Sequence, residues 1–271
     1  MVQKIKKTNK RKLFGMLGFM LLVSLVFHSL TPTDYLRPKT TEEFARTSVM
    51  ITNLAKNSGG SGVILSSKFN ESIILTNRHV CELARQGGYV IKEDKEYRVA
   101  AIKPAKSHDM CEVKVNANLG INTKVAENAP RIYSDAYISG HPSLYPHVLT
   151  KGSFSGHMEI QIMVDSRACT DKELEEIKRK KEFGKFMMCM MFGMPIIETY
   201  DSQLVSATIL PGSSGSAVFD ENGEIAGLAF ASRSRELSYA LIVPQSYVHK
   251  FVTEEAPKME WTEVNYKRDL F

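Results

Sequence analysis

Over most of its 271 residues, the chain lacks an excess of charge of either sign. Its net charge is +5, and six of the positive charges lie in residues 1–12, so the remaining residues carry a net charge of −1. This balance does not indicate a surface for nucleic acid, and no nucleic-acid partner is expected. No cysteine and histidine stand at the close spacing of a zinc site, so no metal is expected. A repeat of fixed period is also missing. The length suits one two-lobed domain of about 200–250 residues, or two small ones.

Charged residues are absent from residues 13–30, LFGMLGFMLLVSLVFHSL, which follow the basic segment at 1–12. A basic start before an apolar stretch is typical of a signal peptide or a single membrane span, and the stretch is apolar on all faces, unlike a core helix. No cleavage site with small residues is evident, which favours an uncleaved anchor over a cleaved signal. In both cases the positive-inside rule places the basic end in the cytoplasm and the remainder outside it. We therefore expect a single-pass membrane protein with an extracytoplasmic domain, or a secreted or periplasmic product if the signal is cleaved.

Short apolar segments separated by glycine and polar turns dominate the remaining chain. Residues 31–43 indicate a linker. Two sets of predicted strands follow: 46–53, 61–66, 72–77, 88–93, 97–103 and 110–115, then 133–140, 147–154, 157–164, 195–208, 216–219, 224–231 and 238–243. Many short strands at this spacing are typical of a barrel or sandwich. A short helix is expected at 245–252, before a tail at 254–271.

An insert at 169–194 interrupts the second set of strands. Thr170 and Glu173 form a capping box, which predicts a charged helix over 171–183. The methionine-rich run at 186–194 is interpreted as a strand or loop that packs on the barrel. A surface for adaptable peptide binding or for contact with a membrane remains an alternative for this run.

Three segments supply the side chains that nucleophilic acyl transfer requires. They read TNRHV, HDMCEV and PGSSGSAVF, and they contain His79, Asp109 and Ser214. A serine hydroxyl is a weak nucleophile until a histidine accepts its proton, and a carboxylate must fix the tautomer of that histidine. Taken singly, each segment also has a plain structural explanation: a Gly/Ser loop, a histidine at a strand end, and an aspartate in a turn.

Together the three segments resemble the chymotrypsin-fold serine proteases, which have the order His, Asp, Ser. GSGVILS and ILTNRHV resemble the strand pair that delivers the catalytic histidine, and PGSSGSAVFDENGEIAGLAF resembles the nucleophile loop with the hairpin that follows it. The likeness is closest to the bacterial Htr-type and glutamyl-endopeptidase-like branch, through ISGHP, TKGSFSG and LSYALIVP. It extends over about residues 44–253. A departure is Ser216-Ala217, where many relatives have Gly-Pro.

The resemblance implies an all-β fold of two six-stranded antiparallel β-barrels, at 44–128 and 129–253. A short C-terminal helix, the helical insert and an N-terminal membrane helix complete the expected architecture. Only about twenty residues follow the second barrel, so the C-terminal peptide-binding domain of the Htr-type proteases is not expected.

The resemblance also implies a serine endopeptidase, tethered to a membrane by residues 13–30, that acts on protein or peptide substrates without a cofactor. Ser214 would attack the carbonyl, His79 would act as general base and then acid, and Asp109 would orient His79. The amides of Gly212 and Ser214 would stabilise the oxyanion.

Substrate recognition is expected along one strand and in one pocket. The backbone of Ala229, Phe230 and Ala231 would pair with an extended substrate. Thr208, six residues before the nucleophile, would lie at the base of the primary specificity pocket, with Ala231 and Ala240 on its walls. None of these side chains is charged, so cleavage is expected after small or medium uncharged residues.

Other functions stay open. The chain could be a catalytically idle protease fold that binds peptides or proteins. An α/β-hydrolase using Ser214 and His249 is disfavoured, because Ser216 replaces the last glycine of GxSxG and strands do not alternate with helices. His108 is a rival to His79 as the base. The oligomeric state is left open.

Four cysteines allow three pairings, and an extracytoplasmic compartment permits disulfides. Cys81 and Cys111 each follow a predicted triad member by two residues, so contact between His79 and Asp109 would bring them together. Cys169 and Cys189 bracket the helical part of the insert. The expected pairs are therefore 81–111 and 169–189, and free buried thiols are the alternative.

Overall fold

The computed structural model describes residues 36–233, 239–264 and 266 of the chain. The predicted basic segment at 1–12, the predicted anchor at 13–30 and the first part of the linker lie outside these residues. Within the described ranges, no helix combines the length and apolar character needed to cross a bilayer. The described residues form one compact unit.

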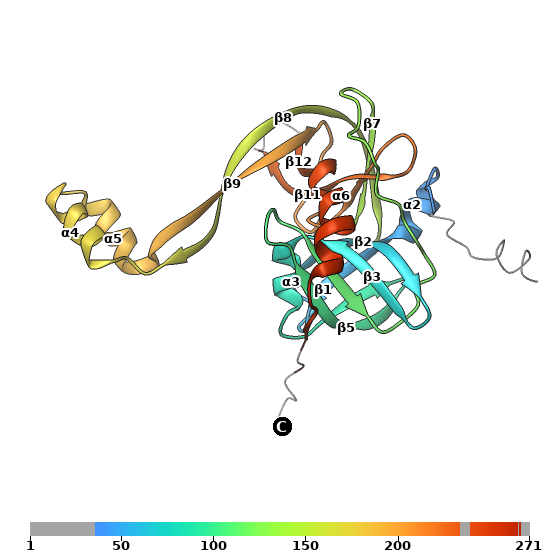
Figure 1. Ribbon diagram of the computed structural model, residues 1–271, viewed down its shortest axis with the longest axis horizontal. Coiled ribbons are helices and arrows are strands. Elements are labelled where there is room, and N and C mark those ends of the chain that lie inside the picture. The colour runs from blue at the N-terminus through green and yellow to red at the C-terminus, as the bar shows by residue number, and fades with distance from the viewer. Residues whose placement is uncertain (1–35, 234–238, 265, 267–271) are drawn as a thin grey trace, which may run out of the picture. The chain divides into compact units, whose positions relative to one another are not determined.

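The first part of this unit is a ring-like antiparallel sheet (Figure 1). Its strands are β1 (Ser48–Asn53), β2 (Gly59–Lys68), β3 (Glu71–Thr76), β4 (Gly88–Lys92), β5 (Lys95–Pro104) and β6 (Cys111–Val115). They run in the order β5-β4-β1-β2-β3-β6, and the pairing of β5 with β6 closes the ring. Apolar residues alternate along these strands, so that Val49, Ile51, Val113 and Val115 are buried in one core. A short strand near the C-terminus, β13 (Thr262–Glu263), pairs with β5.

The second part is a closed six-stranded barrel in the order β10-β11-β12-β9-β8-β7. Its strands are β7 (Asp135–Gly140), β8 (Val148–Arg167), β9 (Met194–Val205), β10 (Ala217–Phe219), β11 (Ile225–Arg233) and β12 (Tyr239–Pro244). A short 3₁₀ helix, η1 (Pro142–Leu144), follows β7. These two sheets agree with the predicted architecture, with one difference: β13 adds a seventh strand to the first sheet.

One hydrophobic cluster joins the two sheets. Leu75 from the first sheet and Met110, just before β6, pack in the same cluster as Phe219 and Leu228 from the second sheet. The helices α2 (Thr41–Thr47) and α6 (Gln245–Lys250) contribute buried residues to it, and α6 continues as η2 (Phe251–Glu255) and η3 (Ala256–Lys258). The segments that carry His79, Asp109 and Ser214 therefore adjoin two sheets that share a packed core.

Strands β8 and β9 continue beyond the barrel as a two-stranded ribbon (Figure 1). Pairing of β9 with β12 ends at Gln203, whereas pairing of β9 with β8 continues to Met194 opposite Arg167. The ribbon carries α4 (Asp171–Arg179) and α5 (Phe183–Phe192) between its strands. The prediction of two strands at 147–154 and 157–164 is therefore corrected to one long strand.

The structure corrects two further predictions in the insert. The predicted helix at 171–183 ends at Arg179, because Lys181 adopts a left-handed backbone with φ of 53°. The methionine-rich run is helix α5, not a strand or loop on the barrel. Methionine is a good helix former, and Gly193 ends the helix with φ of 78°. The predicted capping box of Thr170 and Glu173 is present.

Candidate active site

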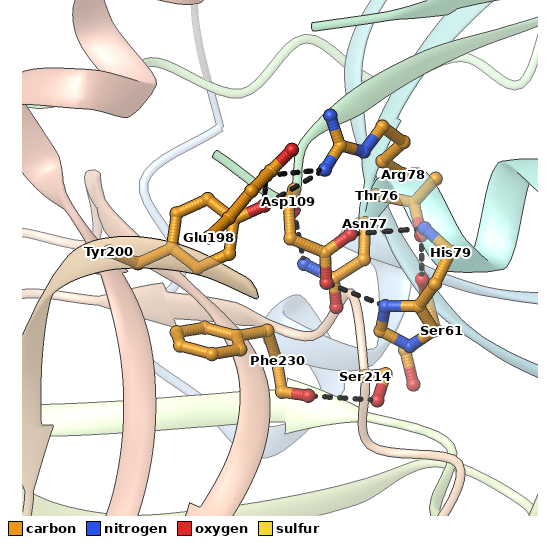
Figure 2. A network of polar contacts seen from close by, with 10 residues as sticks. All are labelled: Ser61, Thr76, Asn77, Arg78, His79, Asp109, Glu198, Tyr200, Ser214 and Phe230. Carbon is orange, nitrogen blue, oxygen red and sulfur yellow. Dashed lines mark hydrogen bonds and ion pairs between the residues drawn. The ribbon is translucent and has the colours of Figure 1, made fainter. Parts of the chain in front are cut away.

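His79 and Asp109 meet at the end of the β3–β6 pair. Strand β3 ends at Thr76, opposite Cys111 at the start of β6, so the two following segments lie side by side. The Asp109 carboxylate accepts the His79 backbone amide at 3.0 Å with Oδ1 and contacts His79 Nδ1 at 2.6 Å with Oδ2 (Figure 2). The imidazole is half exposed, while the Asp109 side chain is only 15% exposed. One carboxylate thus fixes both the main chain and the ring of His79.

The sequence placed His79 at a strand end, but it lies in the first turn of helix α3 (Arg78–Ala84). Asn77 precedes this helix at the N-cap position without capping it through its side chain. Its amide instead donates to the Asp109 carbonyl oxygen at 2.7 Å. Sequence reasoning did not assign Asn77 a role, although an asparagine before a helix is a known N-cap signal.

A disulfide between Cys81 and Cys111 links α3 to β6 beside this pair, and a second links Cys169 to Cys189. Both predicted pairings are confirmed. The first joins residues that lie two positions after His79 and two positions after Asp109, so a covalent bond as well as hydrogen bonds holds these two segments together.

The loop that carries Ser214 is held by contacts with strand β2. Gly212 and Gly215 adopt φ of 90° and 85°, a region that other residues rarely occupy. A Cβ on Gly215 would collide with the Ser61 carbonyl oxygen, so the strand and the loop approach closely. Ser61 donates its amide to the Ser214 carbonyl at 2.7 Å and its hydroxyl to the Gly212 carbonyl at 2.9 Å. Sequence reasoning missed Ser61, although it lies in the GSG start of a predicted strand.

The Ser214 hydroxyl donates to the carbonyl oxygen of Phe230 at 3.3 Å (Figure 2). Phe230 lies at a bulge in β11, between Ala229 and Ala231. Among the hydrogen bonds of the described residues, none joins Ser214 to His79, and the amides of Gly212 and Ser214 have no acceptor. The loop therefore presents two free amide donors beside its serine.

A second polar group lies next to His79. Arg78 donates to Glu198 at 3.2 Å and to the Tyr200 hydroxyl at 2.8 Å, and Tyr200 also donates to Glu198. The hydrogen bond from Tyr200 and then the contact with Arg78 lower the pKa of Glu198, while burial raises the pKa of Tyr200 to about 12. An arginine cation and a glutamate anion thus connect α3 to β9. No local sequence pattern indicates this contact between distant segments.

His108, the rival base, is buried against aromatic rings. Its ring centroid lies 3.7 Å from that of Tyr247 and 5.4 Å from that of Tyr200, and neither of its ring nitrogens has a hydrogen-bond partner. Burial lowers its pKa, which favours the neutral ring. His108 therefore packs against two tyrosine rings and makes no hydrogen bond to the carboxylate of the neighbouring Asp109.

The residues expected to bind substrate lie in different surroundings. Thr208 lines a cavity of about 180 Å³, together with Ile138, Gly140, Pro142, Val148, Thr150, Ile209, Leu210, Ser213 and Ser216. Ala229 and Ala240 are fully buried in the barrel core. Ala231 belongs to β11, but its side chain is outside the described part. No cluster of metal-ligating side chains occurs among the residues that the structure covers.

Comparison with known proteins decides the family. The family model of the trypsin-like peptidase domain matches residues 60–228, more than half of the chain. The chain belongs to the trypsin-like peptidase family. It is a serine endopeptidase of the chymotrypsin fold, as the sequence motifs predicted. The matched range contains His79, Asp109 and Ser214.

Solved structures of serine proteases share this peptidase fold. The inactive serine-to-alanine mutant of Rv3671c from M. tuberculosis H37Rv has a TM-score of 0.60 at 16% identity, over 85% of this chain and 97% of that one. The active form of Rv3671c from M. tuberculosis has a TM-score of 0.59 at 14% identity, and the match covers 83% of this chain and 87% of that one. The serine endoprotease from Yersinia pestis has a TM-score of 0.56 at 20% identity, and the match covers 82% of this chain and 68% of that one. No curated protein sequence matches the chain.

Proposed function

We propose that the chain is a membrane-tethered serine endopeptidase that hydrolyses peptide bonds through Ser214, His79 and Asp109. The observation that carries this proposal is the double contact of the Asp109 carboxylate with the amide and the ring of His79. With Nδ1 donating to the carboxylate, Nε2 is left as the acceptor, which is the tautomer a general base requires.

The reaction begins when Ser214 leaves the Phe230 carbonyl and directs its hydroxyl to Nε2 of His79. The oxygen attacks the scissile carbonyl while His79 takes the proton, and Asp109 stabilises the imidazolium. The free amides of Gly212 and Ser214 stabilise the oxyanion. His79 then protonates the leaving amine, and the acyl-enzyme forms. Water next attacks the acyl carbonyl while His79 takes its proton, and return of that proton to the Ser214 oxygen releases the acid product.

Substrate binding is proposed along β11, where the backbone of residues 229–231 adds the peptide as a further strand. Thr208 is proposed as the base of the primary specificity pocket. Residues 13–30 are proposed as the membrane anchor, with residues 1–12 in the cytoplasm and the peptidase domain outside it. The two disulfides support an extracytoplasmic location, because the cytosol keeps most thiols reduced.

A fluorophosphonate probe tests the mechanism. The wild-type protein should be labelled and should cleave a peptide library, and Ser214→Ala or His79→Ala should abolish both, with a loss of roughly three to six orders of magnitude in turnover. Ser213→Ala and Ser216→Ala are matched controls, because these buried serines flank the nucleophile. Labelling that depends on a flanking serine would identify another nucleophile. A folded wild-type protein with neither labelling nor cleavage would support the idle binding module.

A further inference from the structure

Helix α5 has an uncovered apolar face. At about 100° per residue, its exposed apolar side chains span roughly 160° of the helix circumference. They are Phe183, Met187, Met188, Met190 and Met191, and they are 74%, 41%, 42%, 62% and 65% exposed. Cys189 lies on the other side, buried and joined to Cys169. A face of this size on a short helix marks an interaction surface.

The ribbon explains why the barrel leaves this face uncovered. Beyond Gln203, β9 pairs with β8 and no longer with β12, so α4 and α5 are carried past the end of the barrel pairing. Helix α5 packs on α4, in which Ile177 is buried, and the disulfide joins α5 to Cys169 just before α4. The exposed methionines are therefore available to a partner outside the domain.

The residues next to the apolar face are basic. The five cations nearest α5 lie at residues 178–185, beside one acid, Glu182, whereas four of the five acids of residues 171–192 lie at residues 171–176, so the tip as a whole has a net charge of only +1. Lys180 pairs with Glu176, and Lys185 pairs with Glu182. Within the described part of the chain, Lys178, Arg179 and Lys181 have no ion pair, and Lys178 lies 5.5 Å from the centroid of the Phe186 ring. Free cations thus border an apolar surface.

A cavity of about 370 Å³ lies between the two helices. Its lining combines the apolar side chains of Ile177, Phe183 and Phe186 with those of Lys178, Lys181 and Glu182. This combination suits a ligand with a hydrocarbon part and a negatively charged head.

We propose that the tip formed by α4 and α5, residues 171–192, docks on an anionic lipid surface. Phenylalanine and methionine enter the boundary between headgroups and acyl chains, and the lysines contact anionic headgroups. The face is a helix surface with flexible side chains and is bordered by cations, which matches a lipid surface better than a shaped protein groove. This inference does not depend on the proposed anchor or on proteolysis.

Vesicle sedimentation tests the proposal with the fragment 36–271, whose described residues form one compact unit with three hydrophobic clusters and two disulfides. The thermal unfolding of this fragment and its variants is compared with that of the full chain to verify folding. The fragment should sediment with vesicles of phosphatidylcholine and phosphatidylserine, and much less with phosphatidylcholine alone. Met190→Gln with Met191→Gln should weaken binding at least tenfold. Lys178→Gln with Lys181→Gln should weaken it about fivefold per lysine at low salt and reduce its salt dependence.

Matched controls lie elsewhere on the surface. Phe69→Gln removes a 93% exposed aromatic ring, and Lys95→Gln with Lys106→Gln removes two exposed cations. These variants should bind vesicles as the wild type does. Absence of vesicle binding, or equal losses in the control variants, would overturn the proposal. Dimerisation of the free fragment that Met190→Gln with Met191→Gln abolishes, without vesicle binding, would identify a second copy as the occupant and would also overturn it.

Discussion

Removal of the Cys81–Cys111 disulfide should both destabilise the domain and reduce catalysis. Both sulfur atoms are buried, so the suitable variant is Cys81→Ala with Cys111→Ala, which introduces no buried hydroxyl. The bridge spans 30 residues. A covalent loop of that length corresponds to about 3.6 kcal/mol of chain entropy in the unfolded state. For a domain of this size the loss should lower the melting temperature by about 7 to 14 °C.

The catalytic effect follows from the position of the bridge. Each cysteine lies two residues after a proposed triad member, so its loss loosens α3 against β6 where His79 meets Asp109. A displacement of about 1 Å at such a site costs up to about 100-fold in rate. The value of kcat/KM should therefore fall at temperatures where the variant is still folded.

The second disulfide provides a matched control. Cys169 and Cys189 are 20 residues apart, and the same entropy argument gives about 3.3 kcal/mol, but this bridge lies where the tip joins the end of the ribbon. Cys169→Ala with Cys189→Ala should leave the main unfolding transition and kcat/KM unchanged, while the tip becomes sensitive to proteolysis. Calorimetry and peptide hydrolysis measure both variants. Equal losses in the two variants, or no loss in the first, would refute the reasoning.

Three further results are expected. In Asp109→Asn the amide oxygen should keep the hydrogen bond from the His79 backbone N–H, so the new side-chain NH₂ faces Nδ1 and the imidazole proton moves to Nε2. His79 can then no longer accept the serine proton, and kcat should fall by about 10⁴. A loss below tenfold would contradict this role of Asp109. Burial, opposed by Lys103, raises the pKa of Glu112 to about 7, so the folded state binds this proton more tightly and stability falls as pH rises from 4.5 to about 7. In Glu112→Gln, the free energy of unfolding measured by chemical denaturation should no longer fall over this pH range. If it falls with pH as steeply as in the wild type, the pKa of Glu112 is not the cause. A cleavage profile from a peptide library should favour small or medium uncharged residues, and a preference for Arg, Lys, Asp or Glu would reject Thr208 as the base of the pocket.

The sequence predicted the strands better than the short helices. Alternating apolar residues and turn signals located most strands, since each element carries its own pattern. Helix α3 has only seven residues, too few for a periodic signal, and its stability comes from packing. The methionine-rich run was misjudged because an apolar run without charges fits a strand and a helix equally well.

Long-range contacts limit how much of the site can be predicted from the sequence. The motifs around His79 and Ser214 were visible because glycines and strand ends surround them in the sequence. The contact of Arg78 with Glu198 joins residues that are 120 positions apart, and no local pattern announces it. The direction of the Ser214 hydroxyl depends on a rotamer and on the bulge at Phe230, neither of which composition or spacing determines.

The hydrogen bond from Ser214 to Phe230 has a consequence for the order of events in catalysis. Phe230 lies in the strand that is proposed to pair with substrate, so an arriving peptide would offer its own N–H groups to the same row of carbonyls. A peptide N–H that takes this acceptor frees the serine hydroxyl to turn to the imidazole. On this mechanism the resting enzyme keeps its nucleophile apart from its base, and the correct ligand removes that restraint as it binds. Selectivity would then arise partly from switching the catalyst on, in addition to the fit of side chains in a pocket.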